Sequence, residues 1–338
     1  MGRFLVLVVT TLVVAILYDL VVFRAPEFFE TEAPPQAVQF LDRMPNEAVQ
    51  RMKLRAQKAD IGLFGNSRAM MVGARDVGPG DCRFFNYTVS GSSLRNSVAL
   101  LEILTEGRRA PAIAVVSLDH FEIGMMGNPE YLPLPRMLAL AAADVGSVIG
   151  EPKVAARVAF RHLYVVWGKF RRAISSSYFP RVVDFVLGQD PLGGRPYLVD
   201  GSRVAEEKAG ATADHAFHPA AGEEIIDSLL VRDLARLKAM EGAPGGPSRI
   251  IVYESPLNPE NAARYADAAT PGAARHRAVA AKACGDLGLS CRLGGVYPTV
   301  VDAASDAAWS DASHAPAAAL GPFIRELVAP IACAGIGS

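Results

Sequence analysis

The chain has 338 residues, of which 51% are hydrophobic and 20% are charged, and its formal net charge is −1. This balance excludes an intrinsically disordered or fibrous protein, and it gives no overall charge that would attract a nucleic acid. The length is sufficient for one large domain with an insertion or for two smaller domains.

The first predicted element is an apolar helix from Phe4 to Phe23, whose only polar residues are Thr10, Thr11 and Asp19. A helix of this length, at about 1.5 Å per residue, spans the roughly 30 Å hydrocarbon core of a bilayer. No small-residue cleavage site follows the run, so residues 1–24 are predicted to be an uncleaved, single-pass anchor. Arg3 precedes the run and glutamates follow it, which places the remaining chain outside the cytoplasm.

Residues 25–37 are rich in proline and glutamate and are predicted to form a short exposed stalk. A globular domain is predicted over residues 38–330, and residues 331–338 are predicted to be a tail. The expected location is a bacterial cytoplasmic (inner) membrane, with the domain on its periplasmic or outer side.

From Asp60 onward, short apolar runs alternate with helical patterns. The runs are Ile61–Phe64, Phe84–Val89, Ala112–Leu118, Arg249–Glu254 and Ser290–Tyr297, and the helices include Leu94–Thr105, Ala273–Leu287 and Pro316–Val328. Nearly continuous apolar strands separated by helices are typical of a parallel sheet covered on both faces. We therefore predict an α/β fold with a flavodoxin-like, doubly wound, five-stranded parallel sheet, in which ligands bind at the carboxyl ends of the strands.

The third and fourth predicted strands are too far apart for one crossover helix, so an inserted helical cap is predicted over approximately residues 121–248. Within it, Pro152 to Val183 contains seven basic residues and no acidic one, with aromatic residues interleaved. Two alternatives remain open for this stretch. It lies on a membrane surface or against a partner, or it is an ordinary amphipathic helix with a solvated basic face.

The four cysteines, Cys82, Cys284, Cys291 and Cys333, do not have the spacing of a metal site. An oxidising compartment would permit a bridge between Cys284 and Cys291, and the alternative is that the cysteines are small buried residues with free thiols.

Two short polar motifs are the candidates for chemistry. Gly65-Asn66-Ser67-Arg68 follows the first predicted strand, so Ser67 is expected on a strand-to-helix turn at the carboxyl edge. Asp311-Ala312-Ser313-His314 lies just before the final helix. A serine hydroxyl needs a base within hydrogen-bonding reach, and that base needs a carboxylate to orient it. The residues required for such a triad are therefore present.

These motifs resemble those of the SGNH, or GDSL-like, hydrolase family over roughly residues 60–118 and 249–328. The resemblance implies that Ser67 is the nucleophile, His314 the base and Asp311 the residue that orients it. It also implies that the backbone N–H groups of Ser67 and Gly91 form an oxyanion hole. The family's third block supplies an Asn donor, but Asp119 stands there in this chain, and an ionised Asp cannot donate. Either a protonated Asp119 donates, the hole has two donors, or catalysis is impaired.

Several other residues could contribute to the site. Asn66, Arg68, Glu254 and Asn258 are candidate substrate contacts. His120 is either an alternative base or a structural histidine, and His215 with His218 forms a weak metal motif, for which the prediction remains no metal. No cofactor is predicted.

The leading hypothesis is a serine acylesterase or O-acyltransferase that acts on ester groups of cell-envelope glycans. The resemblance is to divergent envelope members of the family, which implies a membrane-bound O-acyltransferase or a polysaccharide-modifying complex as partner, besides the lipid bilayer, and no nucleic acid. The alternatives are a catalytically silent scaffold in an envelope assembly complex and a lysophospholipase-like lipid esterase.

Overall fold

The computed structural model describes part of the chain. The described residues are 6, 10, 53–54, 59–77, 82–90, 92–119, 134–174, 200–202, 223–256, 271–294, 297, 300 and 314–329. Within these ranges no helix has the length and hydrophobicity needed to cross a membrane. Nearly all of the predicted anchor, and the whole of the predicted stalk and tail, lie outside them. The chain divides into two compact units, Met1–Ala56 with Gly127–Val199 and Gln57–Met126 with Asp200–Ser338.

The second unit contains a five-stranded parallel sheet. Its strands are β1 (Ile61–Phe64), β2 (Phe84–Asn86), β3 (Ile113–Leu118), β4 (Arg249–Glu254) and β5 (Ser290–Arg292), in the order β2-β1-β3-β4-β5. The predicted α/β class and the five-stranded parallel sheet are confirmed. After β1 the chain forms β2 on one side of that strand and later β3 on its other side. The order therefore reverses between β1 and β3, where doubly wound folds bind their ligands.

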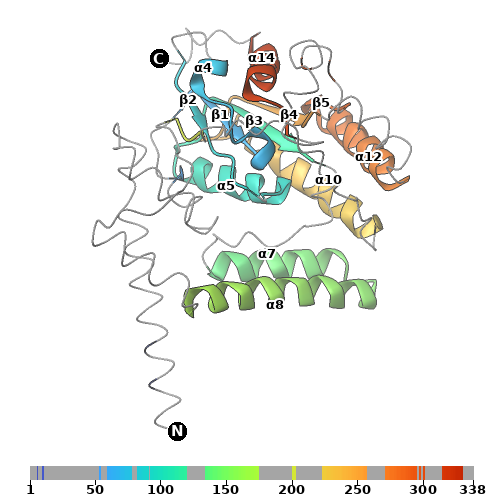
Figure 1. Cartoon of the computed structure of the whole chain (residues 1–338). Coiled ribbons are helices and arrows are strands. Elements are labelled where there is room, and N and C mark those ends of the chain that lie inside the picture. Colours follow the sequence, from blue (N-terminus) through green and yellow to red (C-terminus); the bar gives the residue numbers. More distant parts are fainter. Residues whose placement is uncertain are drawn as a thin grey trace. The chain divides into compact units, whose positions relative to one another are not determined.

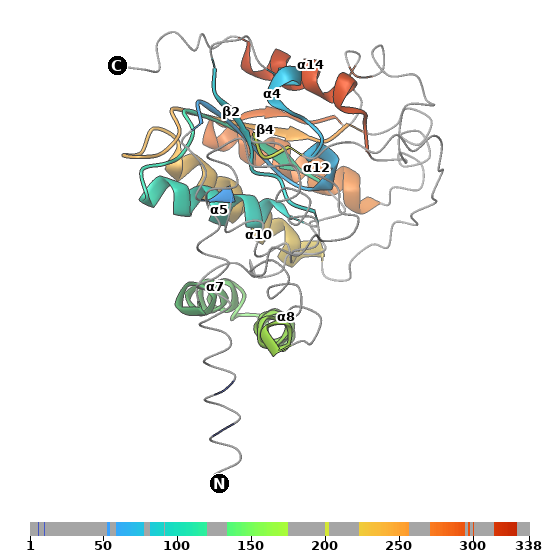
Figure 2. The same ribbon diagram turned by 60° about the vertical axis from the view of Figure 1, so that its left-hand side comes forward.

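Helices cover both faces of the sheet (Figures 1 and 2). One layer contains α5 (Leu94–Glu106), α10 (Glu223–Met240) and α12 (Pro271–Leu287), and the other contains α4 (Ala74–Val77) and α14 (Ala317–Val328). All residues of β1 and β3 are buried, as expected for strands covered on both faces. The helices predicted at Leu94–Thr105, Ala273–Leu287 and Pro316–Val328 are present within two residues of these bounds.

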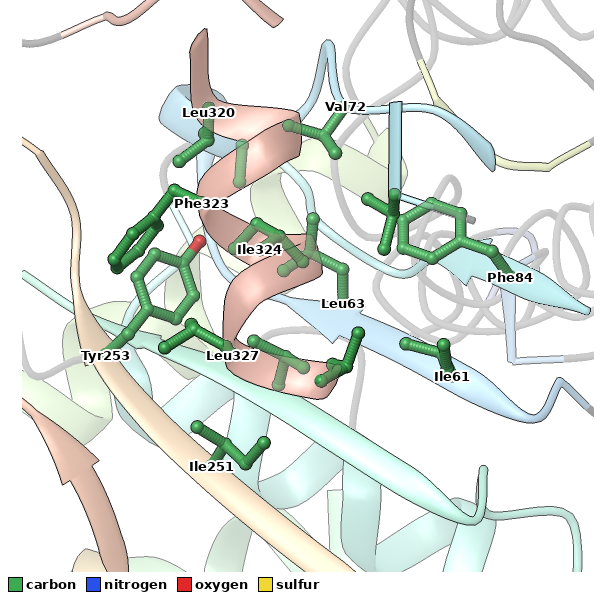
Figure 3. Close-up of a cluster of buried hydrophobic side chains, with 14 of the residues drawn as sticks. Ile61, Leu63, Val72, Phe84, Ile251, Tyr253, Leu320, Phe323, Ile324 and Leu327 are labelled. Carbon is green, nitrogen blue, oxygen red and sulfur yellow. The ribbon is translucent and has the colours of Figure 1, made fainter. Parts of the chain in front are cut away.

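The core between the sheet and α14 is shown in Figure 3. Alternate strand residues point toward this helix because successive side chains of a strand face opposite sides of the sheet. They are Ile61, Leu63, Ile113, Val115, Ile251 and Tyr253, and α14 packs Leu320, Phe323, Ile324 and Leu327 against them. This packing holds the amino-terminal end of α14, and with it the preceding His314, close to the central strands.

Strand β2 is shorter than the predicted run Phe84–Val89. Asn86 Oδ1 accepts from the backbone N–H of Thr88 at 2.9 Å, which forms a local turn and ends the regular strand. The backbone N–H groups of Tyr87 and Val89 still donate to carbonyls of Leu63 and Gly65. Strand β5 likewise ends at Arg292, before the predicted Tyr297.

Helix α10 lies within the range predicted as an insertion, but it packs against α5 and α12 in the α/β unit. Leu230, Leu234 and Leu237 recur at helical spacing and are fully buried. The buried side chains of Arg95 in α5 and Asp233 in α10 form an ion pair with an Nε to Oδ2 distance of 3.0 Å. Gly127–Val199, also within that range, belongs instead to the other compact unit, together with Met1–Ala56.

The first unit contains two described helices, α7 (Leu134–Ser147) and α8 (Pro152–Ile174), which lie side by side (Figures 1 and 2). Four residues connect them, a length typical of an antiparallel helical hairpin. His162 Nε2 of α8 lies 2.8 Å from Asp144 Oδ2 of α7, and both side chains are buried.

Cys284 in α12 and Cys291 in β5 form a disulfide. Cys82 is also disulfide-bonded. The alternative that these cysteines carry free thiols was therefore wrong, because the short connection between α12 and β5 brings Cys284 and Cys291 within bonding distance.

Candidate functional site

The predicted nucleophile and base lie within hydrogen-bonding distance of each other. His314 Nε2 lies 2.9 Å from Ser67 Oγ, although 247 residues separate them in the chain. Ser67 is the first residue of η2 (Ser67–Ala69), a short 3-10 helix after β1, and His314 lies just before α14. Both side chains are partly exposed, which leaves the pair accessible from solvent. This geometry meets the first requirement for activating a serine hydroxyl.

The turn that presents Ser67 requires glycine at position 65. Its φ is 156°, and a Cβ added there would lie 2.1 Å from Ser117 Oγ and 2.9 Å from Ser117 Cβ. Adjacent strands therefore approach too closely for any other residue. The sequence predicted a helix directly after Ser67, but the structure has only the three-residue 3-10 helix η2 there. The single 3-10 turn provides little of the dipole that a longer helix would contribute.

Asp119 lies beside Ser67 because β1 and β3 are neighbours. The register pairs Phe64 with Val116, and each candidate residue lies three positions beyond its strand's paired residue. The Asp119 carboxylate is buried and accepts hydrogen bonds from Asn66 Nδ2 and from Arg68 Nη1, the latter at 3.0 Å. The residues on both sides of Ser67 are thus attached to the end of β3.

Asn66 also stabilises the turn on its own strand. Its side-chain Oδ1 accepts from the backbone N–H of Arg68 at 2.9 Å, as expected for a cap of η2. The side chains of Asn66 and Arg68, both candidate substrate contacts, each donate a hydrogen bond to Asp119. Both therefore have a structural role in holding the turn.

Tyr253 is a buried residue of β4, the strand next to β3, and it was not singled out from the sequence. It is fully buried in β4, and burial, followed by the nearby negative charge of Asp119, raises the pKa of its phenol well above its usual range. Positive charge on Arg68 acts in the opposite direction. The phenol therefore stays protonated beside the Asp119 and Arg68 pair. No local pattern in the apolar run Arg249–Glu254 distinguishes Tyr253 from its neighbours.

Asn86 is a second residue that the sequence analysis missed. Its side-chain amide donates to the carbonyl oxygens of Ala69 and Val72, each at 2.8 Å. These bonds hold the chain that follows Ser67 against the end of β2. A fully buried Asn at the end of an apolar strand is the sequence feature that could have indicated it.

Glu254, a predicted substrate contact, makes structural contacts at the end of β4. Its buried carboxylate accepts from Arg277 at 2.6 and 2.9 Å and from the backbone N–H of Gly294 at 2.7 Å. The hydrogen bond and charge of Glu254 raise the pKa of the Arg277 guanidinium. These bonds connect β4 to α12 and to the segment after β5, and substrate contact by Glu254 stays a prediction.

Six candidate site residues from the sequence analysis lie outside the described part of the chain. They are Gly91, His120, His215, His218, Asn258 and Asp311. The orienting role of Asp311 and the oxyanion role of Gly91 therefore stay predictions.

Comparison with protein-family models, with curated proteins and with solved structures finds no match for this chain. The chemistry of the site is therefore argued from its own geometry. A serine hydroxyl paired with an imidazole, on a turn fixed to two neighbouring strands, is an arrangement suited to nucleophilic acyl transfer.

Proposed function

We propose that this protein is a membrane-anchored serine acylesterase or O-acyltransferase of the SGNH, GDSL-like type. The observation that supports this most directly is the 2.9 Å distance from His314 Nε2 to Ser67 Oγ. It is supported further by the position of Ser67 between β1 and β3, where the strand order reverses.

In the proposed reaction, Ser67 Oγ attacks the carbonyl carbon of an ester while His314 Nε2 accepts the hydroxyl proton. The C–O bond to the leaving alcohol then breaks, and His314 returns the proton to that alcohol. Water or a sugar hydroxyl next attacks the acyl carbon and gives its proton to His314. The bond from that carbon to Ser67 Oγ then breaks, and His314 returns the proton to Ser67. Asp311 would orient His314, and the backbone N–H groups of Ser67 and Gly91 would bind the oxyanion.

Asp119 has a positioning role in this proposal. It accepts from Asn66 and Arg68 and so fixes the turn that carries Ser67, instead of donating to the oxyanion. The oxyanion hole then has two backbone donors, which is one of the alternatives that the sequence left open. A preorganised turn is what such a hole requires, because its donors must not move as charge develops.

The proposed location is the outer side of a bacterial cytoplasmic membrane, with residues 1–24 as a single-pass anchor and an inserted helical cap. The bridge between Cys284 and Cys291 supports an oxidising compartment. The proposed substrates are ester groups of cell-envelope glycans, and the proposed partner is a membrane-bound O-acyltransferase or a polysaccharide-modifying complex.

The experiment is labelling of the detergent-solubilised chain with a fluorophosphonate probe, followed by peptide mapping. We expect covalent modification at Ser67, and we expect it to disappear in His314→Ala. Ser117→Ala is the matched control, because Ser117 is a buried serine of β3 whose Oγ has no hydrogen-bond partner among the described residues. This variant is expected to retain labelling.

Absence of labelling in a well-folded chain would reject the enzyme and favour the scaffold. Labelling with a preference for long-chain over short-chain esters would instead favour the lysophospholipase-like esterase.

A further inference from the structure

Helix α8 exposes a row of large apolar side chains. Phe160, Leu163, Tyr164 and Trp167 are each 66 to 70% exposed. They are spaced by three, four and seven residues, so they share one face of the helix. Exposure of this size on consecutive turns is unusual, because soluble helices bury such a stripe.

The opposite side of α8 is already packed. His162, two residues from Phe160, is buried and bonded to Asp144 of α7, and Val158 is buried as well. The hairpin thus uses the His162 face for its own stability, and the aromatic face is not needed for packing between α7 and α8.

Basic side chains border the aromatic face. Lys153, Arg157 and Arg161 are exposed and follow one another at intervals of four residues. Lys153 continues the stripe toward the start of the helix, and Arg157 and Arg161 lie along one edge of it. No acidic residue occurs anywhere in Pro152–Ile174. The face therefore combines apolar rings with positive charge, and it contains no carboxylate that an anionic surface would repel.

This chemistry matches the polar boundary of a bilayer more closely than it matches a protein groove. Tyr and Trp rings favour the headgroup level, where an apolar body and a polar tip are both accommodated, and each Lys or Arg is attracted to anionic lipids. The compact unit that contains α8 also contains Met1–Ala56, and with it the apolar run Phe4–Phe23.

We propose that α8 lies on the surface of an anionic lipid bilayer, with Phe160, Leu163, Tyr164 and Trp167 inserted at headgroup level and Lys153, Arg157 and Arg161 facing the lipid phosphates. Such a contact would hold the α7–α8 hairpin flat on the membrane. It does not depend on the acyl-transfer proposal, since it involves no residue of the Ser67 site.

The test uses the full chain. Its only tryptophans are Trp167 and Trp309, so the substitution Trp309→Phe leaves Trp167 as the sole tryptophan whose fluorescence is measured. The variant is reconstituted in vesicles of phosphatidylcholine alone or mixed with phosphatidylglycerol, each with a fraction of brominated acyl chains. We expect Trp167 fluorescence to be blue-shifted and quenched by the brominated lipid, more strongly in the anionic vesicles.

The charge dependence is tested with Arg157→Gln and Arg161→Gln in the same background. Each is expected to lower the ratio of docked to undocked α8 by about fivefold, because a basic residue near an anionic surface contributes about that factor. Lys282→Gln removes the same charge from an exposed lysine of α12 and is the matched control, expected to leave quenching unchanged.

Two results would overturn the proposal. One is quenching of Trp167 by aqueous iodide to the same extent with and without lipid. The other is a blue shift in detergent that depends on protein concentration, which would assign the face to a second copy of the chain. Raised salt separates this contact from the proposed anchor, since it should release Trp167 while an inserted anchor keeps the chain in the vesicle fraction.

Discussion

At the carboxyl edge of the sheet, charged side chains are buried and paired, whereas on α8 apolar aromatic side chains are exposed to solvent. Asp119 and Arg68 form a buried ion pair beside Ser67. Tyr164 and Trp167 are about two-thirds exposed on the α7–α8 hairpin. Each region departs from the usual distribution of polar and apolar groups in a folded protein.

The two departures have different energetic consequences. A buried charge is stable only while its partner is present, so the site depends on the folded α/β unit for its geometry. An exposed aromatic ring contributes little to folding and becomes favourable only when a partner removes it from water. Substitutions should therefore affect activity or stability in the first region and binding alone in the second.

The largest expected effect is on turnover at the Ser67 pair. Ser67→Ala and His314→Ala are each expected to lower the turnover rate for short p-nitrophenyl esters by about 10³-fold or more. The first removes the nucleophile, and the second removes the base that activates it. The melting temperature should change little. The measurement is steady-state kinetics with each purified variant, and substantial residual turnover in either would reject the assignment.

A large effect on stability is expected from Asp119→Ala. The substitution leaves the buried Arg68 guanidinium without this carboxylate, which should lower the free energy of unfolding by about 3 kcal/mol. Asp286→Ala is the matched control. It breaks an exposed pair with Lys282 in α12 and should cost less than about 0.5 kcal/mol. If chemical denaturation gave equal losses in the free energy of unfolding for the two variants, the buried pair would contribute no more to stability than the exposed one.

A smaller, pH-dependent effect is expected from Tyr87→Phe. Burial raises the pKa of Tyr87, whose ring stacks on Phe64 and whose hydroxyl has no hydrogen-bond partner in the part of the chain that the structure describes. Above about pH 10 the unfolded chain loses this proton and the folded chain keeps it, so stability falls as pH rises, by about 1.4 kcal/mol per pH unit.

Tyr87→Phe removes that contribution, and the variant should lose less stability than the parent between neutral and strongly alkaline pH. The measurement is denaturant unfolding as a function of pH, with Tyr164→Phe as the same change on an exposed side chain. Parallel pH profiles for the parent and Tyr87→Phe would contradict the prediction.

The smallest expected effect is on folding when α8 loses an exposed ring. Trp167→Ala should change the free energy of unfolding in detergent by less than about 0.5 kcal/mol, because an exposed side chain makes few folded-state contacts. A loss of several kcal/mol in denaturant unfolding would mean that the face packs inside the protein, and it would remove the basis for the membrane contact.

Much of the α/β unit could be predicted because its determinants are local. Apolar runs such as Ile61–Phe64 and Ile113–Leu118 are buried on both faces, and they stand out in the sequence without knowledge of their neighbours. Their alternation with helices indicated a parallel sheet. The early end of β2 was missed, because it depends on the side chain of Asn86 bonding to its own backbone.

The candidate site was only partly predictable. Ser67, His314 and Asp119 were identified from short motifs, but the motifs carry no distances. The role of Asn86 was missed, because it acts through hydrogen bonds to the carbonyl oxygens of Ala69 and Val72, which lie outside its own strand. Likewise, the sequence left open whether Cys284 and Cys291 were bonded.

Local periodicity and hydrophobicity were sufficient to predict the five strands, three of the helices and the residue types at the carboxyl edge of the sheet. Which of those residues lie close together depends on how the strands and helices pack. The register of β1 with β3 places Asp119 beside Ser67, and the packing of α14 on the sheet brings His314 to the same serine. Long-range contacts of this kind follow from the burial of whole elements against one another, which no local pattern encodes.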